Sequence, residues 1–214
     1  MTARLPPREI RIRRRALDKL FLYAKRCPVE IGGLGTLEED AEGLLVSDLF
    51  LLGQKVSASD TELDPEALFE YLGRLVADGG DVAGVRVWWH SHADMDVMWS
   101  ETDRTTISNL PGDFWVALVV NRRGEVACRL DVFAPERWTW DLPLVELPDE
   151  TPDDPEVLRS AIEREILEKV RAYVVVEDVI GSEGVAGMLT EYPIPLTLET
   201  EPAPHEPGEA RRGK

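Results

Sequence analysis

The stretch Val82-Ala-Gly-Val-Arg-Val-Trp-Trp-His-Ser-His92 decides the fold class of this 214-residue chain. Its first eight residues are apolar apart from Gly84 and Arg86, which predicts a buried central strand. Its end carries two of the chain's three histidines, His90 and His92. Because residues i and i+2 of a strand project from the same face, we expect both imidazoles to point to one spot.

A helix is predicted to follow, from Ser100 to about Leu110, because serine is a favoured N-cap and an acid three residues later completes a capping pattern. Asp103 would lie in the first turn and face back toward the strand end. Two imidazoles and a carboxylate are a common donor set for zinc, and three protein ligands leave a fourth position for water, as in catalytic sites. We therefore predict that His90, His92 and Asp103 hold one Zn²⁺ ion per chain.

Each half of this group also has a simpler interpretation. The two histidines could be a hydrogen-bonded surface pair, and Ser100–Asp103 could be only a helix N-terminus. Asp94 and Asp96, in the intervening loop, could be additional ligands, although solvated loop carboxylates are the more common case. The combination at this spacing favours the metal interpretation over either half alone.

Two other classes of zinc enzyme are not supported, because their motifs are missing. The sequence has no His-Glu-x-x-His, which the zincins require. It also lacks the His-x-Glu and Pro-Cys-x-x-Cys of nucleoside deaminases. Its two cysteines, Cys27 and Cys128, form no Cys-x-x-Cys pair, and we interpret them as reduced core thiols rather than as a disulfide or as metal ligands.

Strand and helix patterns alternate on both sides of the central strand. Upstream, hydrophobic periodicity predicts a strand near Ile10, a helix over 14–26, strands over 30–37 and 43–56, and a helix after Asp64-Pro65. Downstream, strands over 114–121 and 125–133 would form a hairpin. The pattern predicts a fold of the α/β (α+β) class, with a mixed β-sheet flanked by helices, over residues 8–140.

The composition changes near Glu146. We expect residues 141–154 to be an acidic, proline-rich linker, because 146–156 holds six acids, three prolines and no basic residue. A separable C-terminal appendage of a helix and a strand would follow over 155–198, and a disordered tail over 199–214. The helix needs a cover for its apolar stripe, either the domain or a protein partner; the stripe consists of Leu158, Ala161, Ile162, Ile166 and Val170.

Charge and hydropathy limit the classes of partner. The net charge of −17 argues against nucleic acid, although residues 1–27 carry nine Lys or Arg against two acids. No apolar run approaches the roughly 20 residues of a membrane helix, and no secretory signal opens the chain. We therefore expect no membrane partner and a cytoplasmic location.

His90-x-His92, seven residues, Ser100, two residues and Asp103 together resemble the JAMM motif of the MPN+ zinc metalloproteases, in a form typical of prokaryotic members. The resemblance covers roughly residues 8–135. It implies an MPN-type, cytidine deaminase-like domain that hydrolyses peptide or isopeptide bonds. Glu30, in Val29-Glu30-Ile31-Gly32-Gly33, is similar to the upstream catalytic glutamate of that family, and Ser100 to its oxyanion donor.

By this resemblance, the substrates would be conjugates or precursors of ubiquitin-like proteins. A metal-free scaffold that binds partners is the alternative, but such relatives typically lose ligands and this chain keeps the whole set. One departure is Ala93, because the second histidine of the family is usually followed by proline. This departure removes no metal ligand, but it affects the path of the loop over 93–99.

Overall fold

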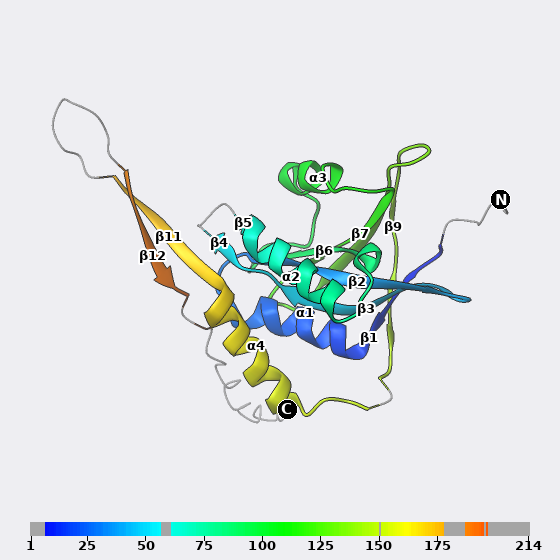
Figure 1. The fold of residues 1–214 in the computed structure, drawn as a ribbon, viewed down its shortest axis with the longest axis horizontal. Helices are drawn as coiled ribbons and strands as arrows, with labels where there is room; N and C mark the ends of the chain where they lie inside the picture. The colour runs from blue at the N-terminus through cyan, green and yellow to red at the C-terminus, as the bar shows by residue number, and fades with distance from the viewer. Residues whose placement is uncertain (1–6, 57–60, 150, 178–186, 195, 197–214) are drawn as a thin grey trace, which may run out of the picture.

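The computed structural model describes residues 7–56, 61–149, 151–177, 187–194 and 196 (Figure 1). The elements, in chain order, are β1 (Ile10–Arg13), α1 (Arg14–Arg26), β2 (Gly32–Asp40), β3 (Gly43–Leu51), β4 (Gln54–Val56), β5 (Thr61–Leu63), α2 (Pro65–Ala77), a 3₁₀ turn η1 (Val82–Gly84), β6 (Val85–Ser91), α3 (Glu101–Ser108), β7 (Phe114–Val120), β8 (Val126–Val132), β9 (Trp138–Asp141), β10 (Leu144–Leu147), α4 (Pro155–Lys169), β11 (Val170–Glu177) and β12 (Gly187–Pro193).

The strands form a mixed sheet of eight, in the order β10-β1-β3-β2-β6-β7-β8-β9. The predicted central strand, β6, lies inside it, antiparallel to β2 and parallel to β7. The two edge strands, β9 and β10, are joined by only Leu142 and Pro143. Because Asp141 and Leu144 are only three residues apart, their Cα atoms lie within about 11 Å of each other, so the edges must approach and the sheet curls. The predicted α/β class with a mixed sheet is confirmed.

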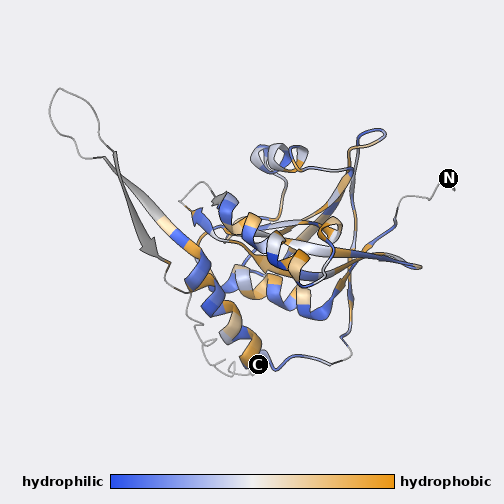
Figure 2. Ribbon diagram, viewed as in Figure 1, coloured by the Kyte–Doolittle hydropathy of each residue, from blue (hydrophilic) through white to orange (hydrophobic). Residues whose placement is uncertain are grey.

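Helices cover both faces of the curled sheet, because β6 is apolar on both sides. Trp89 is fully buried in the larger core, where it stacks on Tyr23 of α1 with ring centroids 5.0 Å apart. Its neighbour Trp88 points to the opposite face, into a second cluster that includes Ile107 of α3 and borders α2. Figure 2 shows apolar and hydrophilic residues interspersed along α1 and α4, as expected for helices that bury one face.

Close packing of β2 against its neighbours depends on glycine. A Cβ atom at Gly33 would lie 2.2 Å from the carbonyl oxygen of Phe50 and 2.9 Å from the ring of Trp89. A side chain therefore does not fit at this position, as the sequence pattern predicted. The strand itself is longer than predicted and runs to Asp40.

The predicted strand over 43–56 is two strands in two different sheets. β3 ends at Leu51, and β4 begins at Gln54 in a separate sheet with the order β12-β11-β4-β5. Leu52 and Gly53 form the break, which the run of apolar residues did not reveal. Within the region 155–198, where a strand was predicted after the helix, β11 follows α4 directly and pairs in parallel with β4.

The predicted linker over 141–154 is partly wrong, because Leu144–Leu147 form β10 and pair in parallel with β1. Ion pairs with the start of α1 explain why this acidic segment lies against the domain. Arg14 pairs with Glu146 at 3.1 Å, and Arg15 pairs with Asp153 at 2.8 Å. The acids thus neutralise the basic start of α1, and the domain extends beyond residue 140 to at least Leu147.

The C-terminal helix packs on the domain, because α4 lies against α1 and shares its core. Four residues of the apolar stripe are buried in the larger cluster: Leu158, Ile162, Ile166 and Val170. Tyr23 donates a 2.5 Å hydrogen bond to Glu165, and Arg26 pairs with Glu163 at 2.6 Å. Of the two predicted covers for this stripe, the structure thus has the domain itself.

The predictions of a disordered tail and of no membrane helix concern the rest of the chain. The predicted tail over 199–214 lies outside the described residues. Among the described residues, no helix is long and apolar enough to cross a membrane.

Candidate metal centre

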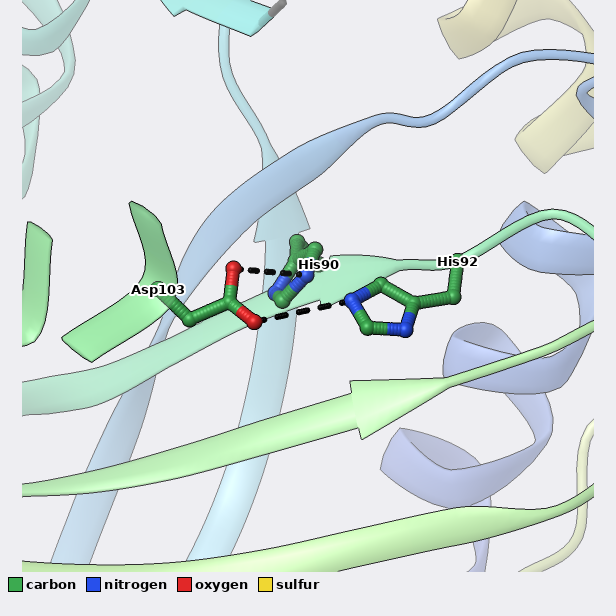
Figure 3. A group of neighbouring side chains, drawn as sticks. All are labelled: His90, His92 and Asp103. Atoms are coloured by element: carbon green, nitrogen blue, oxygen red, sulfur yellow. Dashed lines mark ion pairs between the residues drawn. The ribbon is translucent and has the colours of Figure 1, made fainter. Parts of the chain in front are cut away.

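The two histidines and the aspartate predicted as ligands come together at the end of β6 (Figure 3). His90 Nε2 lies 3.2 Å from Asp103 Oδ1, and His92 Nε2 lies 3.6 Å from Asp103 Oδ2. One ligand atom from each residue lies within 4.8 Å of the others. The group could hold a metal ion.

Asp103 is positioned by the N-terminus of α3. Ser100 is the N-cap: its Oγ accepts a 3.1 Å hydrogen bond from Asp103 N, and Ser100 N donates to Asp103 Oδ2 at 2.7 Å. This is the predicted capping box. Burial raises the pKa of Asp103, but hydrogen bonding to His92, the charge of His90 and the bonds with Ser100 outweigh it and lower the pKa to about 2. The carboxylate is therefore ionised at neutral pH.

The tautomer of His92 follows from its second-nitrogen contact. Nδ1 lies 2.8 Å from the carbonyl oxygen of Asp96, which can only accept, so Nδ1 carries the hydrogen. In the neutral ring, Nε2 keeps its lone pair for a metal ion, whereas in the protonated ring the N–H of Nε2 points to Asp103. Hydrogen bonding to Asp103 raises the pKa of His92, against the effect of burial.

His90 is held in the neutral form by its surroundings. Burial, opposed by the charge of Asp103 and assisted by that of His92, lowers its pKa to about 4. Its Nδ1 is buried and has no hydrogen-bond partner among the described residues. A neutral, buried imidazole is the form of histidine that binds a metal.

The donor set fits zinc. Ligand atoms about 2.0–2.1 Å from a tetrahedral zinc ion lie about 3.3 Å apart. The carboxylate reaches His90 through Oδ1 at 3.2 Å and His92 through Oδ2 at 3.6 Å, and the three ligand atoms lie within 4.8 Å of one another, so small side-chain shifts bring them to this spacing. Two nitrogen donors and one carboxylate also match the ligand types of catalytic zinc sites.

Glu30 lies next to this group, at the start of β2. Gly32 pairs with His90, and Ser91 N donates to the carbonyl of Ile31 at 2.8 Å, so the antiparallel register places Glu30 opposite His92. Glu30 is half-buried, and burial raises its pKa, while the charge of His92 lowers it and that of Asp103 raises it. The structure thus brings all five predicted site residues to one place.

Two buried polar residues that the sequence pattern did not single out fix the backbone beside Glu30. Gln54 Nε2 donates to the carbonyl of Gly32 at 2.7 Å, and Gly32 N donates to Gln54 Oε1 at 3.0 Å. Ser91 Oγ accepts from Ile31 N at 3.1 Å. Gln54 stands directly before Lys55 in the sequence, so no local pattern marked it as a buried amide that needs partners.

The loop over 93–99 follows a path that proline at its first position would prevent. Ala93 has φ 45°, whereas the ring of proline fixes φ near −65°. The carbonyl of Ala93 accepts from Arg122 N at 2.8 Å, and Asn121 Nδ2 donates to the carbonyl of Met95 at 3.0 Å. The turn between β7 and β8 therefore anchors the loop.

The two acids of this loop are paired with arginines. Asp94 pairs with Arg122 at 3.1 Å, and Asp96 pairs with Arg123 at 2.6 Å. Both aspartates are exposed, and neither belongs to the group that could hold a metal. Their charge is thus compensated within the protein.

The apolar residues of the loop divide into two kinds. Trp99 packs on its own domain: its Nε1 donates to Asp141 at 3.0 Å, and the guanidinium of Arg129 lies 4.7 Å from its ring centre. Met95 and Met98 are 58% and 60% exposed. Of these three residues, only the two methionines have side chains exposed enough to contact a substrate.

Comparison with known proteins identifies no relative. No protein-family model matches the sequence, and none of the curated proteins is significantly similar to it.

Proposed function

We propose that this protein is a zinc-dependent hydrolase of peptide or isopeptide bonds, of the JAMM/MPN+ type. The observation that carries the proposal is the convergence of His90, His92 and Asp103 beside the half-buried carboxyl group of Glu30. Three ligands and an adjacent acid–base group are the components of a hydrolytic zinc site.

Zinc would be held by Nε2 of His92, by His90 and by the carboxylate of Asp103. When bound, zinc lowers the pKa of its water ligand and polarises the carbonyl group that is to be cleaved. The capping box fixes Asp103, and the Asp96 carbonyl fixes the ring of His92, so the ligands are oriented before the metal arrives.

Glu30 and Ser100 have separate roles in the proposed reaction. Glu30 accepts a proton from the attacking water and passes it to the leaving amine. The Oγ of Ser100 accepts a hydrogen bond from Asp103 N, which leaves its own hydrogen to donate to the oxygen on which negative charge develops.

The proposed substrates are conjugates or tailed precursors of ubiquitin-like proteins, with cleavage after a slim Gly-Gly end. The exposed Met95 and Met98 provide an apolar contact near the site. Because Asp94 and Asp96 are paired with arginines, we expect recognition to depend on shape and apolar contact more than on loop charge. The cytoplasmic location stays a prediction.

The test is zinc content together with a cleavage screen on ubiquitin-like conjugates and tailed precursors. Wild-type protein should carry one zinc per chain and cleave at least one substrate. His92→Ala should lose both, and His205→Ala, which removes the third histidine of the sequence, should lose neither. Full zinc with no cleavage would overturn the hydrolase proposal, and absence of zinc from wild-type protein would overturn the metal assignment and favour the metal-free scaffold.

A further inference from the structure

A cavity of about 780 Å³ opens at the end of the curled sheet away from the metal group. It lies between the β2–β3 hairpin tip, the start of β7 and strands β8 and β9. β7 connects the two regions: Phe114 lines the cavity, and Val119 pairs with His90. Five residues of strand separate them by about 17 Å. The cavity volume is within the usual range for ligand sites, and barrel mouths are frequent locations of such sites.

The wall of this cavity is apolar and partly aromatic. Leu130 and Val132 of β8 lie opposite Trp140 and Trp138 of β9. The two indole rings stack, with centroids 5.9 Å apart, and Trp138 is 54% exposed. Trp140, Phe114 and Val132 are only half-buried. An apolar side chain that entered here would cover surface that the described residues leave partly open to water.

The rim of the cavity is acidic. Five carboxylates line it, against one lining arginine, Arg8; they belong to Glu9, Glu39, Asp40, Glu42 and Asp113. Below the rim, the buried guanidinium of Arg11 binds Asp40 at 2.5 Å and Glu42 at 2.8 Å. Its third contact, with the carbonyl of Gly43 at 3.1 Å, fixes the hairpin tip in place. Arg11 thus compensates Asp40 and Glu42, and the acidic character of the rim rests mainly on the exposed Glu9 and Asp113.

We propose that this mouth is a docking site for a short basic peptide with an apolar anchor residue. The anchor, an aliphatic or aromatic side chain, enters between Phe114 and Trp140. Flanking Lys or Arg residues of the peptide lie against the carboxylates of the rim, and charge complementarity fixes this choice of partner. An acidic peptide is repelled by the same carboxylates, and a purely polar peptide gains nothing from the wall.

The test is fluorescence anisotropy of the full chain with three labelled peptides. Lys-Leu-Arg-Phe-Lys should bind, whereas the charge-reversed Glu-Leu-Glu-Phe-Glu and the anchor-free Lys-Ser-Arg-Ser-Lys should bind at least about tenfold more weakly. Trp140→Ala should weaken binding about tenfold or more, as loss of an aromatic anchor contact does. Affinity should fall as salt rises.

A surface variant tests the same site without removing a packed side chain such as that of Trp140. Glu9→Gln/Asp113→Asn changes two exposed rim acids and should weaken binding several-fold with an unchanged melting temperature. The matched pair Glu66→Gln/Glu70→Gln, on α2, should bind as wild type does. Zinc content should be unchanged in all of these variants, so the result is independent of the proposed hydrolase activity.

Several outcomes would overturn the proposal. These are no binding of the first peptide, equal binding of the charge-reversed or the anchor-free peptide, and equal weakening by the α2 pair. Binding that appears only after deletion of residues 1–6 would assign the cavity to the chain's own N-terminus. Self-association that Trp140→Ala abolishes, without peptide binding, would assign it to a second copy.

Discussion

Gln54 and Gly32 form a pair of hydrogen bonds that resembles one rung of a β-ladder. The amide of Gln54 accepts from Gly32 N at 3.0 Å and donates to the Gly32 carbonyl at 2.7 Å, and a third bond ties it to the carbonyl of Leu52. Gly32 pairs with His90 on its other side. A side chain thus replaces a strand at the point where β3 leaves β2, two residues from Glu30.

Replacing this amide should disturb both stability and the site. Gln54→Met keeps the length of the side chain but leaves the N–H and carbonyl of Gly32 buried without partners. We expect the free energy of unfolding to fall by about 1–3 kcal/mol. Because Glu30 would lose its fixed position, kcat should fall while zinc content is retained. Unchanged denaturant midpoint and unchanged kcat would together show that Gln54 has no positioning role.

Glu30→Gln separates the acid–base role from metal binding. The variant keeps its shape but cannot take a proton at neutral pH, so it should retain zinc and lose about 10²–10⁴-fold in turnover. Metal analysis and kinetics on the purified protein provide the measurement. Glu38→Gln, at the exposed end of the same strand, is the control and should behave as wild type. A zinc-free Glu30→Gln protein would instead make Glu30 a ligand.

Ala93→Pro should destabilise the loop that connects the strand end to α3. Proline cannot adopt φ 45°, so the loop must leave its contacts with Arg122 and Asn121, at an expected cost of about 1–3 kcal/mol. Ala93→Gly is the control, because glycine tolerates positive φ, and it should remain within about 1 kcal/mol of wild type. Thermal melts give the melting temperatures of the two variants. Equal melting temperatures would contradict the role of this backbone angle.

The two cysteines should resist thiol reagents in the folded protein. Burial raises the pKa of Cys27 to about 11, despite lowering by the Val29 backbone and Arg122. Burial, assisted by the charge of Asp141, raises the pKa of Cys128 to about 12. Thiolate is therefore scarce at pH 8, and alkylation by iodoacetamide should be slow until denaturant is added.

The same shifts predict a loss of stability in base. Unfolded thiols ionise near their ordinary pKa of 9.0, whereas the folded ones stay protonated. The contribution to stability is therefore complete below pH 9 and declines as pH rises toward 11 and 12. Rapid alkylation of native protein at pH 8 would contradict burial of these thiols.

Adjacent residues of α4 provide a matched test of its place in the core. Ile166 is fully buried, and Leu167 is 44% exposed. Ile166→Ala should lower the free energy of unfolding by about 2–5 kcal/mol, and Leu167→Ala by less than about 1 kcal/mol. Urea denaturation measures both. Similar values would mean that α4 does not share the core of the domain.

The local features of the site could be predicted from the sequence because each depends on neighbours in the chain. The i, i+2 spacing of His90 and His92 follows from strand geometry. The Ser100–Asp103 capping box follows from the first turn of a helix. Burial of β6 follows from its apolar run. Each pattern needs fewer than a dozen residues, so no knowledge of distant contacts was required.

Only the tertiary structure decided features that depend on distant partners. The acidic segment after residue 140 looked like a linker, yet Leu144–Leu147 complete the sheet beside β1, and Glu146 meets Arg14. The sequence left Asp94 and Asp96 as possible ligands or solvated acids, and only the fold shows that the turn after β7 supplies Arg122 and Arg123 to them. Gln54 carries no local signal for its partner 22 residues earlier. The physical reason is the same in each case: charges and hydrogen-bonding groups are satisfied by whatever the fold brings near, and sequence distance does not limit that choice.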